Sequence, residues 1–391
     1  DMTESYIGIP RGCETALCDM LTDKVDELNI VDKTNCGEII PVEFNGKLRD
    51  EQEVAADELL KYNIGVLSAT TAFGKTVIAS YIIGQRKTNT LIFVHTQALM
   101  QQWKKSLEQF LKFDIMPPET QKGIGRKKTW SPVGMIGAGK DTLNGIVDIA
   151  VMQSLVDGDE VRELVRNYGM IIVDECHHVS AVNFEKILKY ANAKHVYGLT
   201  ATPARQDGHH PIIFMQCGPI RYRVDAKTQA EKRSFEHYLI PRFTSFRNIS
   251  DDNITTLYKK LSEDTARNNL IINDAVLAVK NHRTPIILTE RREHVAKLTE
   301  MLKLYCDNVV SIVGTASVKS RRETLERLEK ITKDESLAII ATGRYVGEGF
   351  DYPRLDTLLL ALPVPKRNLI SFRSIPIKFS EPSNFSVRLF I

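Results

Sequence analysis

The sequence lacks the features of several specialised classes of protein. It has no apolar run near the ~20 residues that a membrane helix needs, and its start, Asp1-Met2-Thr3-Glu4, lacks the basic and apolar stretches of a signal peptide. Its six cysteines are scattered, which excludes a disulfide-rich scaffold and fits reduced thiols. It also lacks low-complexity segments and repeats with a period of roughly 20–50 residues. These absences predict a cytoplasmic globular protein, and the start suggests a fragment.

Neither sign of charge dominates. The net charge is +3, from 52 basic and 49 acidic residues, so a nucleic-acid partner would have to be held by a local basic groove. One basic cluster contains an aromatic residue, and it consists of Lys122, Arg126, Lys127, Lys128 and Trp130. Two interpretations stay open: the cluster lies along a bound strand with the indole stacked on a base, or it is a solvated loop.

Residues 69–76, Ala-Thr-Thr-Ala-Phe-Gly-Lys-Thr, have the pattern of a phosphate-binding loop between an apolar strand and a helix. Gly74 would allow close approach of the backbone, Lys75 would reach the β- and γ-phosphates, and the Thr76 hydroxyl would bind Mg²⁺. Ala69 replaces the usual first glycine. Ala72 and Phe73 fill the arch of the loop, and Thr71, Ala72 and Phe73 are expected to bind the nucleotide together with residues 74–76.

An acidic doublet follows an apolar run about a hundred residues later, in Ile171-Ile172-Val173-Asp174-Glu175-Cys176-His177-His178. Asp174 is expected to hold Mg²⁺, and Glu175 to orient and deprotonate the attacking water. An N-capping pair of acids would not explain the distant Lys75. His177 is interpreted as a polar bridge from the nucleotide, because adjacent histidines rarely point at one zinc ion. Together the two motifs predict a nucleoside triphosphatase.

A second glycine–lysine segment is interpreted differently. Residues 134–140 have similar spacing, but Asp141 follows where a hydroxyl is needed, and a carboxylate there would repel phosphate. We predict a hairpin turn.

The alternation of apolar runs and helical stretches predicts an α/β protein with two parallel sheets flanked by helices. Residues 48–225 would form the first lobe, 226–280 a connector with one helix around 254–280, and 281–363 a smaller second lobe. Residues 1–47 are expected to be an accessory segment, and residues 364–391 an irregular tail. Predicted strands are 64–68, 90–95, 148–152, 170–174, 196–200, 285–289, 309–313, 337–342 and 357–362. Predicted helices are 75–83, 97–111, 183–191, 293–305 and 319–331.

Four segments (69–76, 174–177, 200–203 and the one after His95) lie where these strands end, which is where ligands collect in open parallel sheets. Several short motifs are recognisable along the chain. They are Arg49-Asp50-Glu51-Gln52, Thr90–Thr96 with Gln102-Trp103, Gln153-Ser154-Leu155, Gly198–Pro203, Ala341-Thr342-Gly343 and Gly347–Asp351. With the phosphate loop and the acidic doublet, this ordered set resembles superfamily 2 helicases of the DExH kind, close to XPB-like and bacterial conflict-system helicases. The resemblance covers roughly residues 48–363.

The resemblance implies two RecA-like lobes, the second truncated, with ATP and Mg²⁺ between them and nucleic-acid backbone across their top. It implies nucleotide contacts for Arg49, Gln52, Gly349 and Asp351. It also implies coupling of hydrolysis to strand movement for Thr200, Ala201 and Thr202. Nucleic-acid contacts are implied for Thr96, Gln102, Gln153, Ser154, Thr342 and Gly343, with DNA favoured over RNA.

One family motif is missing. After Pro363 no Gln-x-x-Gly-Arg-x-x-Arg helix follows, although such an arginine finger contributes about 10³–10⁵ in rate in related enzymes. We hypothesise slow ATP hydrolysis unless a partner protein or a further C-terminal region supplies the arginine. The alternatives are a non-hydrolysing, ATP-gated nucleic-acid-binding module and a triphosphatase that remodels protein. Stimulation of ATP hydrolysis by nucleic acid would distinguish them.

Overall fold

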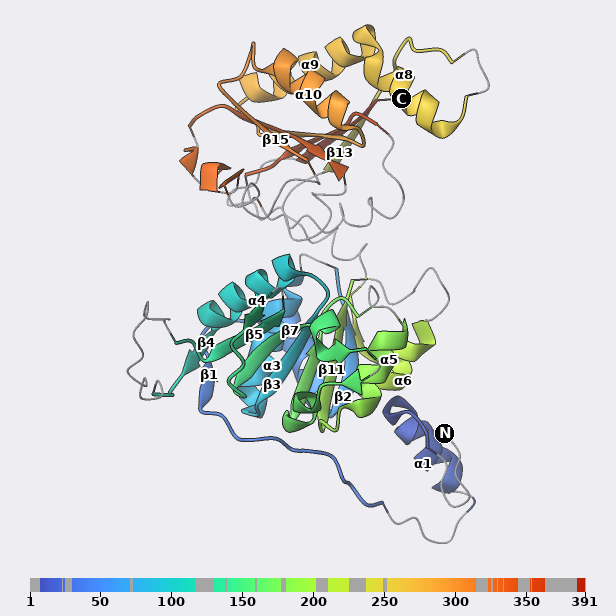
Figure 1. Ribbon diagram of the computed structural model, residues 1–391, viewed down its shortest axis with the longest axis vertical. Coiled ribbons are helices and arrows are strands. Elements are labelled where there is room, and N and C mark those ends of the chain that lie inside the picture. The colour runs from blue at the N-terminus through green and yellow to red at the C-terminus, as the bar shows by residue number, and fades with distance from the viewer. Residues whose placement is uncertain are drawn as a thin grey trace. The chain divides into compact units, whose positions relative to one another are not determined.

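The structure, a computed structural model, describes most of the chain in two compact units, Asp1–Thr228 and Gln229–Ile391 (Figure 1). The described residues are 8–22, 24, 30–70, 73–116, 130–137, 139–158, 160–176, 181–201, 210–224, 237–248, 252–313, 323–324, 326–328, 330–332, 334–343, 352, 354–362 and 385–390. None of the helices described in these ranges is both long and apolar enough to cross a membrane.

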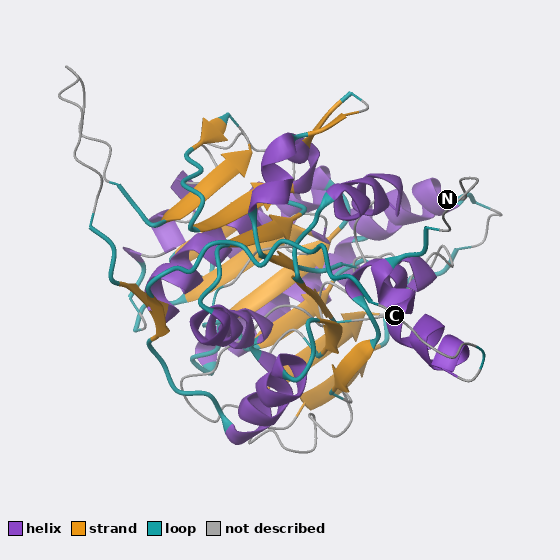
Figure 2. Cartoon of the chain, turned by 90° about the horizontal axis from the view of Figure 1, so that it is seen from below, coloured by secondary structure: helices purple, strands orange, loops and turns teal. Residues whose placement is uncertain are grey.

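The first unit contains an eight-stranded sheet with the strand order β12-β2-β11-β10-β3-β7-β5-β6, parallel throughout except for the β5–β6 pair. Its strands are β2 (Ile64–Ser68), β3 (Thr90–Val94), β5 (Val133–Gly137), β6 (Lys140–Asp141), β7 (Val147–Val151), β10 (Met170–Val173), β11 (His195–Thr200) and β12 (Ile220–Arg223). Its main helices are α2 (Asp50–Leu60), α3 (Lys75–Arg86), α4 (Gln97–Phe110), α5 (Ala181–Tyr190) and α6 (His210–Cys217). Figure 2 colours these helices and strands by type.

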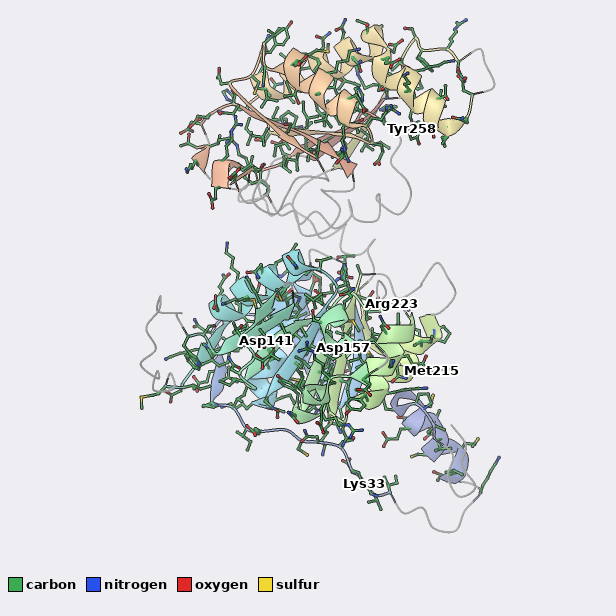
Figure 3. All side chains as sticks on the ribbon, viewed as in Figure 1. Lys33, Asp141, Asp157, Met215, Arg223 and Tyr258 are labelled. Atoms are coloured by element: carbon green, nitrogen blue, oxygen red, sulfur yellow. The ribbon has the colours of Figure 1, made fainter. Side chains whose placement is uncertain are left out.

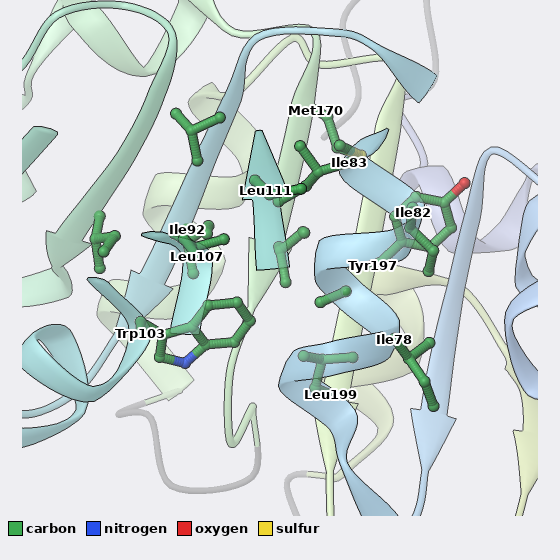
Figure 4. Packing of buried hydrophobic residues seen from close by; sticks show 14 of the residues in the cluster. Ile78, Ile82, Ile83, Ile92, Trp103, Leu107, Leu111, Met170, Tyr197 and Leu199 are labelled. Carbon is green, nitrogen blue, oxygen red and sulfur yellow. The ribbon is translucent and has the colours of Figure 1, made fainter. Parts of the chain in front are cut away.

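The strands read as continuous apolar runs because both faces of the sheet are covered. Alternate residues enter two separate hydrophobic clusters, as Leu67 and Val66 on β2 illustrate. Residues of α2, α3 and α4 complete the first cluster, part of which is drawn in Figure 4, and residues of α5 and α6 complete the second. The buried sheet gives the loops at its edge a rigid support.

The predicted strands and helices of this unit are confirmed with shifts of a few residues at their ends. The predicted hairpin at 134–140 is also confirmed, since β5 and β6 are antiparallel. However, Val133–Gly137 is itself a fully buried strand that pairs with β7, which the sequence interpretation missed. Its two glycines hid the strand pattern.

The N-terminal residues that precede the eight-stranded sheet contact several elements of the first unit. Arg11 donates hydrogen bonds to the carbonyl oxygens of Leu188 (2.7 Å) and Ala191 (2.6 Å) at the end of α5, which satisfies carbonyls that the helix leaves without partners. Helix α1 (Glu14–Thr22) follows. The extended segment beyond it carries Lys33, labelled in Figure 3, whose carbonyl accepts a hydrogen bond from Asn192 (3.0 Å). It ends in β1 (Val42–Phe44), which pairs with β4 (Leu111–Phe113).

The second unit contains a six-stranded parallel sheet with the order β13-β18-β17-β14-β16-β15. Its strands are β13 (His237–Arg242), β14 (Pro285–Thr289), β15 (Asn308–Ile312), β16 (Leu337–Thr342), β17 (Thr357–Leu360) and β18 (Phe385–Phe390). Its helices include α8 (Ile254–Glu263), α9 (Thr265–Lys280) and α10 (Arg292–Leu302). The described residues between 323 and 330 are helical as well.

Two expectations about this part of the chain need correction. The single helix expected around 254–280 is two helices, because Asp264 ends α8 and caps α9 by accepting a hydrogen bond from the Arg267 backbone N–H (2.6 Å). Helix α9 packs with β14 in one hydrophobic cluster, so the segment predicted as a connector contributes to the core.

The tail expected to be irregular contains a strand. Residues Phe385–Phe390 pair in parallel with β13 and β17. Phe, Val and Leu alternate with Ser and Arg over residues 385–389, a period of two in a run too short to predict a strand clearly.

His294 in this unit predicts sensitivity to acid. The side chain is 1% exposed, its Nδ1 lies 2.9 Å from Thr289 Oγ1, and its Nε2 lies 2.8 Å from Asn268 Oδ1. Burial, and then the charges of Arg267, Lys297 and Arg291, lower the pKa of His294 from 6.5 to about 3. Below pH 6.5 the unfolded chain therefore binds a proton that the folded chain does not, and stability falls as the pH falls toward 3.

Between pH 7 and pH 5 this difference is expected to cost about 2 kcal/mol of unfolding free energy. His294→Gln keeps a side-chain amide beside Asn268 and cannot titrate. Urea midpoints from far-ultraviolet circular dichroism should therefore fall further in the parent than in His294→Gln between these pH values. Equal falls would contradict the prediction.

Candidate nucleotide and nucleic-acid site

The site in the first unit forms where parallel strands β2, β10 and β11 end at one edge of the sheet. Lys75 begins α3 and lies 6 residues beyond the start of the loop, yet its Nζ reaches Glu175 Oε1 at 2.9 Å. The same ammonium lies 3.3 Å from the carbonyl oxygen of Ala69. The ammonium is 6% exposed and the glutamate 18%, so this pair is largely shielded from solvent. The structure therefore brings together the two motifs that the sequence separates by 100 residues.

Two side chains at the start of α2 fix the phosphate loop by hydrogen bonds. The carbonyl oxygen of Phe73 accepts hydrogen bonds from Gln52 Nε2 (2.7 Å) and Arg49 Nη2 (2.6 Å). Gly74 has φ +88°, a left-handed conformation that glycine adopts without strain. A Cβ at this position would lie 2.4 Å from Gln52 Nε2. Arg49 and Gln52 thus fix the loop that leads into the helix.

Thr76 occupies the first turn of α3 and is half-buried beside Lys75. The backbone N–H groups of such a turn lack partners within the helix, and they favour an anion. The predicted loop residues Thr71 and Ala72 lie outside the described residues.

Asp174 follows β10 and is buried, with 6% of the residue exposed. Its Oδ2 accepts a hydrogen bond from Trp103 Nε1 (2.7 Å), and its Oδ1 accepts one from the backbone N–H of Glu175 (3.0 Å). Burial and then the neighbouring charge of Glu175 raise the pKa of Asp174 to about 6, against opposing effects of Lys75, Trp103 and His95. A buried and a half-buried carboxylate beside one ammonium are chemically suited to a divalent cation, which prefers oxygen ligands. Asp174 and the Thr76 hydroxyl are the residues that would hold it.

The backbone is strained at the second acid. Glu175 has φ +46°, a conformation that few residues other than glycine adopt. Hydrogen bonds fix the chain on both sides, from Asp174 N to Phe93 O (2.9 Å) and from Cys176 N to Leu199 O (3.1 Å). Strain of this kind is concentrated at functional sites. His177 lies outside the described residues.

The proposed coupling segment is attached to the phosphate loop through the backbone. Thr200 is buried at the end of β11, and its carbonyl oxygen accepts a hydrogen bond from the N–H of Ala69 (2.9 Å). Ala201 is half-buried in the bend that follows, and Thr202 lies outside the described residues.

The predicted nucleic-acid residues of the first unit follow two adjacent strands. Thr96 lies just beyond β3 and caps α4 by accepting a hydrogen bond from Leu99 N (3.3 Å). Gln153 and Ser154 lie on the 3₁₀ turn Met152–Leu155 that follows β7, the neighbour of β3. Gln102 and Gln153 are exposed and Ser154 is half-buried, so these polar groups are available at one sheet edge.

The second unit contains further residues predicted to contact nucleic acid or nucleotide. Thr342 ends β16 and is 7% exposed, and buried Gly343 follows it. Gly349 and Asp351, expected to contact the nucleotide, lie outside the described residues.

Sequence reasoning missed the role of Trp103. The Gln102-Trp103 pair was assigned as a whole to a nucleic-acid motif, but Trp103 is 1% exposed and bonded to Asp174. The helical spacing offered a signal, since Met100, Trp103 and Leu107 share the buried side of α4.

A lysine at a helix start, paired with an acid that follows another strand of the same parallel sheet, is typical of nucleoside triphosphatases. The model of the type III restriction enzyme res subunit family matches residues 45–205. The DNA 3'-5' translocase XPB2 of Sulfurisphaera tokodaii is 25% identical over 78% of this chain and 73% of the relative. Putative helicase 161L of Invertebrate iridescent virus 6 is 27% identical over 83% of this chain and 73% of the relative.

Among solved structures, the Pyrococcus furiosus Hef helicase domain has a similar fold, with a TM-score of 0.56 and 16% identity over 88% of this chain and 95% of that one. These matches and the similar fold support the superfamily 2 helicase family, with RecA-like α/β units. The chain is an ATP-dependent helicase or translocase, and the alternative of a non-hydrolysing module is not favoured.

Proposed function

We propose that the first unit binds ATP with Mg²⁺ at the edge formed by β2, β10 and β11, and that hydrolysis there drives movement along DNA. The observation that supports this proposal most is the 2.9 Å ion pair between Lys75 and Glu175. The two side chains come from different strand–loop elements, and a shared triphosphate would lie beside both.

Each residue of the site has a distinct role in this proposal. Lys75 releases Glu175 and contacts the β- and γ-phosphates, while Gly74 and Thr76 present backbone N–H groups to the same anion. Glu175 then orients the attacking water and accepts its proton. Asp174 and Thr76 would hold Mg²⁺, which would neutralise part of the negative charge of the phosphates. Gln52 and Arg49 keep the loop in place and face the adenine side.

We propose that nucleic-acid backbone crosses the first unit at Thr96, Gln102, Gln153 and Ser154, and contacts the second unit at Thr342. Backbone contacts carry little sequence information, so binding should be weakly sequence-specific and weaken with salt. The relative described as a DNA translocase favours DNA as the strand.

We propose that a partner protein, or a further part of a longer chain, supplies the arginine finger, because residues 364–391 contain no Gln-x-x-Gly-Arg-x-x-Arg motif. Arginine stabilises charge that develops on the γ-phosphate during transfer. The Lys75 ammonium alone offers less charge to the transition state, so the 391-residue chain is expected to turn over slowly.

The test is steady-state ATP hydrolysis with and without single-stranded DNA or RNA. We expect single-stranded DNA to stimulate hydrolysis, with the stimulation decreasing as salt rises. ATP-dependent DNA binding without turnover would support the non-hydrolysing module instead. Neither stimulation nor ATP-dependent binding would contradict the proposed function.

A further inference from the structure

Trp103 connects two parts of the site that the sequence treats separately. Its helix, α4, is capped by Thr96 and exposes Gln102, and both residues are proposed to contact nucleic acid. The next residue, Trp103, lies on the buried side of the helix, where it is 1% exposed and its indole N–H donates to Asp174 Oδ2 at 2.7 Å. One rigid helix therefore carries both a nucleic-acid segment and a hydrogen bond to the proposed metal-binding carboxylate.

The indole is fixed in position by its surroundings. Figure 4 shows the ring among apolar side chains that include Ile92 on β3 and Leu107 on α4. A tightly packed aromatic ring cannot change rotamer without displacing its neighbours. The indole N–H is a donor only, so it stabilises the ionised, accepting form of the carboxylate.

The hydrogen bond also determines which way the carboxylate faces. Asp174 Oδ1 is held by the Glu175 N–H and Oδ2 by the indole, so both oxygens have a fixed direction while each keeps a further lone pair. Groups that orient a metal-binding side chain typically change metal affinity by about 10–100-fold when they are removed.

We propose that Trp103 is a positioning residue, which orients Asp174 for Mg²⁺ and transmits displacement of α4 by nucleic acid to the metal site. This inference rests on the proposed function, since it requires Asp174 to hold the cation. It predicts that Mg²⁺ binding and nucleic-acid binding are thermodynamically linked through α4, and that the link depends on one N–H group.

The experiment measures ADP binding by calorimetry over a range of Mg²⁺ concentrations. Trp103→Phe keeps an aromatic ring and removes the donor, and it should raise the Mg²⁺ concentration for half-maximal effect about 10-fold. ADP binding without Mg²⁺ should be unchanged, which a general packing defect would not spare. Tyr305→Phe, which removes a donor from an exposed aromatic ring without a proposed role, should behave as the parent does.

Single-stranded DNA provides the second readout. In the parent it should change the Mg²⁺ midpoint by about 5-fold, and Trp103→Phe should remove most of this change. Equal changes in the two proteins would overturn the link.

A spectroscopic measurement covers the case in which Trp103→Phe fails to fold. In ¹⁵N-tryptophan-labelled Trp130→Phe protein, one indole N–H resonance remains, because the chain has only two tryptophans. Asp174→Asn should move that resonance, and an unmoved resonance would exclude the hydrogen bond. If Asp174→Asn leaves the Mg²⁺ dependence unchanged, the proposed metal site itself is wrong. If Asp174→Asn shifts the midpoint and Trp103→Phe does not, only the positioning role is wrong.

Discussion

Glu175→Gln is expected to lower DNA-stimulated ATP hydrolysis by about 10³-fold while ATP binding persists, because the amide cannot accept the proton of the attacking water. Lys75→Ala is expected to act on an earlier step. It removes the cation that faces the phosphates. It also removes the ammonium that lies 2.9 Å from the Glu175 carboxylate, and the negative charge of that carboxylate then repels the phosphates. Turnover and ATP affinity should both fall. Steady-state hydrolysis and ATP binding by calorimetry, measured for each variant, separate the two effects.

An exposed ion pair of the same unit provides matched controls. Lys189 and Glu185 on α5 lie 3.0 Å apart with half and about a third of their side chains exposed (50% and 37%). Glu185→Gln and Lys189→Ala repeat the chemical changes where solvent screens the charges, so both should hydrolyse ATP at the parent's rate. If Glu175→Gln turned over ATP as fast as Glu185→Gln, Glu175 would not be the base.

Gly74→Ala is expected to weaken ATP binding by about 100-fold, an effect that a misplacement of roughly 1 Å in a preorganised site can produce. The new Cβ would lie 2.4 Å from Gln52 Nε2, so the glutamine must move away from the Phe73 carbonyl that it holds. The left-handed φ of +88° adds backbone strain. ATP binding by calorimetry, with far-ultraviolet circular dichroism to monitor folding, measures the loss.

Gly139 provides a control that distinguishes backbone strain from a steric clash of the added Cβ. It also has a left-handed φ, +75°, but no atom lies within 4 Å of the Cβ that alanine would add. Gly139→Ala should therefore cost stability through strain alone and leave ATP affinity unchanged. In the Gln52→Ala background the clashing amide is absent, so Gly74→Ala should lower ATP affinity by a smaller factor there than in the parent. An equal factor in both backgrounds would show that strain, rather than the clash, is responsible.

The sequence predicted most buried strands and the motifs at their ends, but it did not predict every strand of the first sheet. Strands with buried faces on both sides, such as Ile64–Ser68, have a continuous apolar pattern, and the motifs beyond them are recognisable by residue type. The strand Val133–Gly137 was missed because glycine carries no hydrophobic signal, although its pairing with β7 buries it fully. Tertiary pairing, which no local pattern encodes, decided its conformation.

Partnerships across the fold were also beyond local reasoning. Arg49 and Gln52 were assigned to the nucleotide by resemblance, whereas the structure gives their hydrogen bonds to the carbonyl of Phe73. The indole of Trp103 and the carboxylate of Asp174 are 71 residues apart, and only the adjacency of β3 and β10 brings their segments together. A linear pattern shows which groups are present, and the sheet order determines which of them meet.

The family match starts at residue 45, but the fold of the first unit starts earlier. Ile40 and Val42 are 4% and 1% exposed in the first hydrophobic cluster, and the strand containing Val42 covers the edge of β4. A recombinant fragment trimmed to the match would uncover that apolar surface and leave an unpaired strand edge, a known route to aggregation. Expression boundaries for this unit therefore belong upstream of Arg11, whose guanidinium closes the end of α5.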